Sequence, residues 1–127
     1  MSELVKVAVK DLHGAALDWA VAKCYGTEDN YLNRIKMYPS MTSGPSNTWE
    51  QGGPIIERKN ISLCRPTGKY WFAWNDQIAG CDKQYGDTPL IAAMRYVVAS
   101  ELGSEIEVPK ELEKYSLQKV IKQSVER

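Results

Sequence analysis

The sequence predicts an α+β fold, in which a small antiparallel sheet packs with two main helices and a further helix follows at the C-terminus. Short stretches rich in β-branched and aromatic residues indicate the strands. Two longer stretches carry apolar residues at helical spacing, and a glycine follows each of them. The 127 residues suffice for one hydrophobic core. We therefore expect residues 1–112 to form a single domain and residues 113–127 a C-terminal helical extension.

Composition and charge narrow the classes of partner. Hydrophobic residues make up 43% of the chain and charged residues 25%, which is typical of a globular domain. Sixteen basic and sixteen acidic residues cancel. A protein that binds a nucleic-acid backbone normally presents a net basic face, so nucleic acid is disfavoured as the main partner. A net charge of zero is still compatible with a local cluster of basic residues.

Other patterns bear on membranes, metals and compartment. No apolar run approaches the roughly 20 residues that span a bilayer, and the N-terminal residues lack the pattern of a signal peptide. Three widely spaced cysteines, one histidine and no Cys-x-x-Cys motif indicate neither a zinc site nor a disulfide framework. We expect a cytosolic protein with free, partly buried thiols, no metal and no cofactor.

The first half of the chain begins with an apolar strand, residues 4–9. A helix is predicted from Leu12 to Tyr25, with Asp11 as its cap and a glycine at its end. In this helix we expect Trp19 to be a core residue and Asp18 to face solvent. Residues 27–47 are polar and lack clear periodicity, although residues 31–35 fit one helical turn. This segment is predicted to be a long binding loop.

The stretch from Thr48 to Arg58 is also predicted to be a loop, because it contains Gly52-Gly53-Pro54, which a helix interior normally excludes. Two glycines leave the main chain open to a ligand. Trp49 in this loop offers a face for stacking. The alternative is an ordinary turn whose tryptophan packs into the core.

The second half is predicted to open with a hairpin of residues 60–63 and 69–74, joined by a turn at 66–68. Strand alternation places Tyr70, Phe72 and Trp74 on one face, with Trp71 and Ala73 on the other. Residues 75–85 are predicted to be a loop. A helix is expected over 90–102, with Asp87 or Thr88 as its cap, a proline in its first turn and Gly103 at its end.

Three blocks of sequence, residues 14–23, 49–58 and 88–95, together with Val-Pro-Lys-Glu-Leu at 108–112, resemble the NinX-like proteins of tailed bacteriophages. The resemblance covers roughly residues 4–112. Glu50 departs from the small residue expected there, and the chain after Leu112 is longer than usual. The family is catalogued as a domain of unknown function. The resemblance implies an accessory protein that acts in the cytoplasm of the host bacterium. Counteracting host defence is one role that such a protein could have.

The predicted ligand site combines aromatic rings with anion-binding groups. Tryptophans would stack on a flat ring, while arginines and the amides at a helix start would hold phosphate. The residues assigned to this site are Trp49, Gln51, Gly52, Gly53, Arg58, Trp74, Thr88 and Arg95. A salt bridge with Glu57 or another acid is an equally good role for Arg58, and a structural ion pair is somewhat favoured for Arg95.

The function predicted from these residues is binding of a small nucleotide-type ligand, with sequestration of a host immune signalling molecule as its most specific form. We predict no catalytic residue, because no nucleophile lies in an activating motif. Two alternatives remain. One is an inhibitor that binds a host protein directly, since tryptophan and tyrosine are also enriched at interfaces. The other is a small nucleotide hydrolase using Asp18, Glu57 or His13. Homo-oligomer formation is a further expectation.

Overall fold

The computed structural model describes residues 3–40, 43–78 and 80–112. Within them the predicted α+β class is confirmed: four α-helices pack with two small antiparallel sheets. The elements in chain order are β1 (Leu4–Ala8), η1 (Val9–Asp11), α1 (Gly14–Cys24), α2 (Glu28–Met37), α3 (Trp49–Arg58), β2 (Ser62–Cys64), β3 (Trp71–Trp74), β4 (Gln84–Gly86), α4 (Pro89–Leu102), β5 (Glu105–Pro109) and η2 (Lys110–Leu112). The predicted C-terminal helix, residues 113–127, lies outside the described residues.

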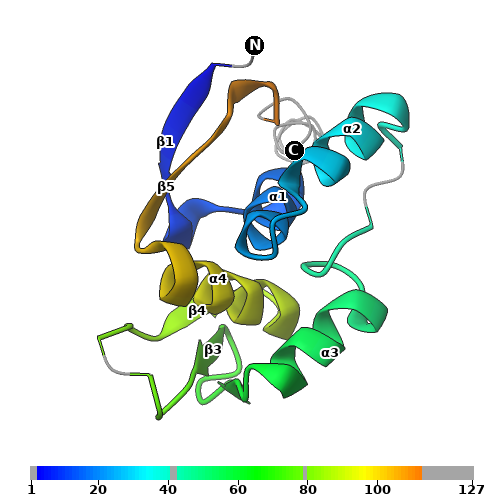
Figure 1. The fold of residues 1–127 in the computed structure, drawn as a ribbon. Coiled ribbons are helices and arrows are strands. Elements are labelled where there is room, and N and C mark those ends of the chain that lie inside the picture. Colours follow the sequence, from blue (N-terminus) through cyan, green and yellow to red (C-terminus); the bar gives the residue numbers. More distant parts are fainter. Residues whose placement is uncertain (1–2, 41–42, 79, 113–127) are drawn as a thin grey trace, which may run out of the picture.

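The first sheet joins the two ends of the described chain. Strands β1 and β5 pair antiparallel, with Leu4 opposite Pro109 and Ala8 opposite Glu105, and lie side by side in Figure 1. Ile106 and Val108 alternate with glutamates along β5 and are buried, as expected for a strand with one covered face. The predicted N-terminal strand is therefore confirmed over residues 4–8.

The second sheet has the order β2-β3-β4, with both pairs antiparallel. The predicted hairpin is confirmed, since Leu63 of β2 lies opposite Ala73 of β3. The prediction of a loop up to residue 85 was wrong at its end, because Gln84 begins β4. A strand of three residues carries too short an alternation to be recognised without its partner.

Helix α4 is the centre of the fold and contacts both sheets and helices α1 and α3 (Figure 1). Its predicted limits are confirmed: the Thr88 side chain accepts a hydrogen bond from the Ile91 amide at 3.1 Å, and Gly103 ends the helix with φ 99°. Gly86 lets α4 approach the sheet closely, because a Cβ there would lie 2.8 Å from the Ala92 nitrogen. The most buried side chains of α4 belong to Ala92, Ala93, Met94, Val97 and Val98.

The prediction of a loop over residues 27–47 was wrong, because Glu28–Met37 forms helix α2. Acidic residues occupy its first turn and basic residues its last, which complements the helix dipole. Tyr31 and Ile35, four residues apart, are its buried contacts with the core. Only these two α2 residues are buried, with Leu32 packed beside them in part, so the helical period is faint in the sequence.

The prediction of a loop over Thr48–Arg58 was also wrong, since Trp49–Arg58 forms helix α3 with Pro54 inside it. Gly52 is buried against the Pro45 carbonyl and Leu90 of α4; a Cβ at this position would lie 2.5 Å from Leu90 Cδ2. This glycine therefore serves close packing between helices rather than a turn. Tertiary packing overrides the weak helix propensity of the two glycines.

Candidate functional site

A hollow of about 540 Å³ lies between helices α1, α2 and α3, and we call it the helix cleft. Its lining combines apolar side chains with two tyrosines, two arginines and one buried carboxylate. The lining residues are Asp18, Val21, Ala22, Tyr25, Thr27, Asn30, Tyr31, Arg34, Pro45, Gln51, Ile55 and Arg58. The volume falls within the range of small-molecule sites.

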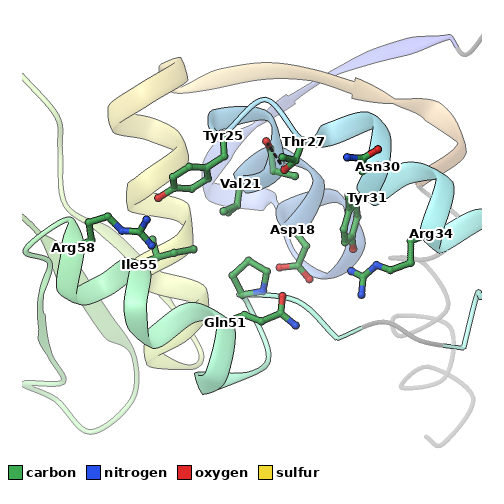
Figure 2. Close-up of a pocket in the computed structure, with 12 residues that line it drawn as sticks. Asp18, Val21, Tyr25, Thr27, Asn30, Tyr31, Arg34, Gln51, Ile55 and Arg58 are labelled. Carbon is green, nitrogen blue, oxygen red and sulfur yellow. Dashed lines mark hydrogen bonds between the residues drawn. The ribbon is translucent and has the colours of Figure 1, made fainter.

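Two arginines stand on opposite sides of the helix cleft, each beside a tyrosine (Figure 2). The Arg34 guanidinium lies 5.2 Å from the Tyr31 ring centre, and that of Arg58 lies 5.8 Å from the Tyr25 ring centre. One Arg34 nitrogen also donates to the Ser43 carbonyl at 3.2 Å. Neither arginine forms a salt bridge with any residue that the structure describes. Their positive charges are therefore available to a ligand.

The floor of the helix cleft joins an apolar surface to a buried carboxylate. Val21 and Ile55 are buried, and the Asp18 carboxylate lies to one side of them, near Gln51 in the view of Figure 2. Asp18 is 1% exposed, and its Oδ1 accepts a hydrogen bond from the Ser46 amide at 2.8 Å. The prediction that Asp18 faces solvent was therefore wrong. Its carboxylate also packs directly against Gly44, where no side chain would fit.

Tyr31 places its hydroxyl at the same end of the cleft. The ring is 8% exposed, and the hydroxyl has no hydrogen-bond partner among the described residues. Burial, and then the charge of Asp18, raise the pKa of this phenol, so it is neutral at physiological pH. A neutral phenol can both donate and accept a hydrogen bond.

A second hollow, of about 620 Å³, lies where helices α1, α3 and α4 begin, and we call it the helix-start hollow. His13 and Gly14, Asn47 and Trp49, and Asp87 to Pro89 line it from the three helix starts. The Trp49 side chain is 56% exposed, which excludes the alternative of a core tryptophan. Arg95 also lines this hollow, but two of its nitrogens already donate to the Leu12 and Tyr85 carbonyls, each at 2.8 Å.

The predicted site residues are thus divided between several places. Gln51 and Arg58 line the helix cleft, whereas Trp49, Thr88 and Arg95 line the helix-start hollow. Gly52 is buried between α3 and α4, and Gly53 lies beside the Trp49 ring. Trp74 belongs to β3 and lines neither hollow.

Sequence reasoning missed Arg34, Tyr25 and Tyr31 as lining residues. A signal for Tyr31 and Arg34 was present: Thr27 precedes two acidic residues, which is a common pattern at a helix start, and Tyr31 and Ile35 are spaced by four. With α2 recognised, Tyr31 and Arg34 would lie one turn apart on the same helix. No comparable signal places Tyr25 opposite Arg58, because that contact joins the end of α1 to α3.

No group of three or more His, Cys, Asp or Glu side chains among the described residues is arranged to hold a metal ion. The three cysteines are free and half-buried. Across residues 3–40, 43–78 and 80–112, no helix has the length and apolar content needed to cross a membrane.

Comparison with known proteins identifies the family. No curated protein matches the chain closely. A family model described as bacteriophage P22 NinX matches residues 8–101, which include both hollows and all of α1 to α3. The match covers most of the chain and agrees with the resemblance of residues 14–23, 49–58 and 88–95. The chain therefore belongs to the phage NinX family, whose function is unknown.

Proposed function

We propose that this NinX-family protein is a phage accessory protein that binds a small nucleotide-type ligand in the helix cleft. The observation that carries the proposal is the placement of Arg34 and Arg58 on opposite sides of an apolar floor (Figure 2). A ligand that fits this arrangement combines a flat ring with negative charge. A nucleotide or cyclic nucleotide combines these two groups.

The arginines suit phosphate better than lysines would. A guanidinium donates several hydrogen bonds in a fixed plane and can bind phosphate oxygens in pairs. Contact with a tyrosine ring holds Arg34 and Arg58 in place without neutralising them. No described acid forms a salt bridge with either one, so a phosphate would displace no ion pair of the described chain.

The floor of the cleft gives the ligand an orientation. The Asp18 carboxylate would repel phosphate from the floor, so the phosphates lie at the rim with the arginines. The ring of the ligand then lies over Val21 and Ile55, within reach of the Tyr25 ring. Tyr25 is 41% exposed and therefore accessible to the ligand. The Gln51 amide, which can both donate and accept, would contact an edge of the base.

In its most specific form, the proposal is that the protein retains a host immune signalling nucleotide in the bacterial cytoplasm without altering it. A phage protein that removes such a signal by binding must bind it tightly and be present in a comparable amount. It need not convert the ligand. This distinguishes it from the hydrolase alternative, in which the same ligand would be converted. The phage family supports the setting, and the cleft supports the ligand class.

The experiment that tests the proposal begins with mass spectrometry of small molecules released by heating the purified protein. A panel of linear and cyclic nucleotides is then titrated, with binding followed by tryptophan fluorescence and ligand integrity by chromatography. Arg34→Gln and Arg58→Gln should each weaken binding by about 1.5–3 kcal/mol, the scale of a hydrogen bond to a charged group. The matched control is Arg65→Gln, since Arg65 also lies over an aromatic ring but outside the cleft.

Each remaining outcome selects another function. Converted nucleotide would establish the hydrolase. Loss of binding in Trp49→Ala with retention in both cleft variants would place the ligand in the helix-start hollow. A released fraction without nucleotides, together with no binding across the panel, would refute the nucleotide proposal and leave the host-protein inhibitor.

A further inference from the structure

The second sheet has an outer face made of aromatic side chains. Helix α4 covers the inner face, where Ala73 is fully buried. Phe72 alternates with Ala73 along β3 and therefore points away from α4. Trp74, at the end of β3, is half-buried and also packs in part against the core. Tyr85 of β4 lies opposite Phe72 in the register and shares its side. Together with Tyr70, which precedes β3, these residues form what we call the aromatic sheet face.

The rings of this face are neighbours. The ring centres of Tyr70 and Tyr85 are 5.9 Å apart, and those of Phe72 and Tyr85 are 6.2 Å apart. Tyr70 is 38% exposed and Tyr85 45% exposed, whereas Phe72 and Trp74 are half-buried. At the rise of a β-strand, the distance from Tyr70 to Trp74 is about 13 Å. The face is thus a line of aromatic rings whose two tyrosines are exposed.

A lysine lies at each end of the line. Lys69 Nζ is 5.5 Å from the Tyr70 ring centre, and Lys83 Nζ is 5.3 Å from the Trp74 ring centre. Both lysines are exposed, and neither forms a salt bridge with a residue in the described part of the chain. Residues 70–74 include no basic side chain. Pairing of β4 with β3 brings Lys83, the residue before β4, beside Trp74.

We propose that the aromatic sheet face binds single-stranded nucleic acid. Aromatic rings offer stacking surfaces to unpaired bases of any identity, and cations beside them hold the phosphates that join those bases. A duplex keeps its bases stacked inside, so it would use the two lysines but not the rings. Lysines at both ends of the line favour a polyanion over an uncharged apolar partner. This site is separate from the helix cleft and does not depend on the nucleotide proposed there.

The test uses the full chain and fluorescence anisotropy of a labelled oligothymidylate, a mixed-sequence RNA strand and a matched duplex. The single strands should bind more tightly than the duplex. Tyr85→Ala and Tyr70→Ala should each weaken single-strand binding about 5- to 150-fold, which corresponds to one stacked base. Lys69→Gln combined with Lys83→Gln should reduce the slope of log K against log salt by about 1.4, because each lysine that holds a phosphate contributes about 0.7.

Two control variants distinguish the aromatic sheet face from the other basic parts of the surface. Lys6→Gln with Lys10→Gln removes two lysines of the first sheet and its following turn, and it should leave the salt dependence unchanged. Arg34→Gln with Arg58→Gln disables the helix cleft and should leave single-strand binding intact. Because Tyr70 precedes β3, its replacement keeps the test valid if Tyr85→Ala fails to fold.

Three results would overturn the proposal. The first is equal affinity for single strand and duplex. The second is binding that both tyrosine variants retain. The third is displacement of the oligonucleotide by polyglutamate at an equal charge concentration, which would assign the face to acidic protein segments.

Discussion

Two adjacent glycines in α3 should respond differently to the same substitution. Alanine in place of glycine inside a helix ordinarily stabilises by about 1 kcal/mol. At Gly53 the added Cβ would lie 3.8 Å from the Trp49 ring, an ordinary contact. Pro54 follows, however, and disfavours helical geometry for a residue with a Cβ before it, so Gly53→Ala should be neutral or only mildly stabilising. At Gly52 the Cβ would meet Leu90 Cδ2 at 2.5 Å and overlap the Pro45 carbonyl.

The size of the effect at Gly52 follows from this overlap. Leu90 can shift its side chain, but the carbonyl belongs to the backbone and moves only with the segment before α3. Overpacking of this kind typically costs about 1–3 kcal/mol. After the gain in helix propensity, Gly52→Ala should be destabilising by up to about 2 kcal/mol, and Gly53→Ala should be the more stable of the two variants by up to about 3 kcal/mol.

Urea denaturation followed by tryptophan fluorescence and far-UV circular dichroism would measure both variants. Thermal melts should separate them in the same order, since 1 kcal/mol corresponds to roughly 2–8 °C for domains of this size class. Equal stabilisation by the two substitutions would refute the packing argument. Destabilisation of Gly53→Ala as large as that of Gly52→Ala would likewise contradict it.

Three further predictions concern α1. Trp19→Ala should cost about 3–5 kcal/mol in urea denaturation, because the side chain is 5% exposed in the core, and a decrease below about 1 kcal/mol would contradict that placement. Asp18→Ala should lower the free energy of unfolding by about 1–3 kcal/mol, because it leaves the buried Ser46 amide without its acceptor; unchanged stability would show that this hydrogen bond is dispensable. The third prediction concerns pH: burial, and then the charge of Glu101, raise the pKa of the Cys24 thiol to about 11, above its ordinary value of 9.0. The unfolded chain therefore releases this proton first, so stability should fall as pH rises from 9 to 11, and Cys24→Ala should reduce that slope in urea titrations at each pH; an identical slope in Cys24→Ala would contradict this assignment.

Elements whose signals are local could be predicted from the sequence. Helix α4 is an example, since the Thr88 cap, the following proline and Gly103 mark its limits within a few residues of the chain. The β2–β3 hairpin and the α+β class follow from alternation and from the turn between two short strands. The family assignment also needs only the sequence, because it compares residues in order.

The helix cleft was decided by the tertiary structure. Its two arginines, Arg34 and Arg58, lie on different helices that the local sequence predicts only faintly. Helix α3 exists because Gly52 permits close contact with α4, a gain that appears only after both helices are present. Asp18 is similar: beside Trp19 in the sequence it looks like a surface charge, yet the Ser46 amide, 28 residues away, makes its burial favourable.

The same reason explains why the predicted site residues were separated. Sequence patterns report period and local geometry, but they do not fix the direction in which a helix presents each side chain to another element. Once residues 49–58 form a helix, Trp49 at its start and Arg58 at its end are a full helix length apart, and they line different hollows. The helical state of α3 depends on packing with α4, so the composition of both hollows does as well.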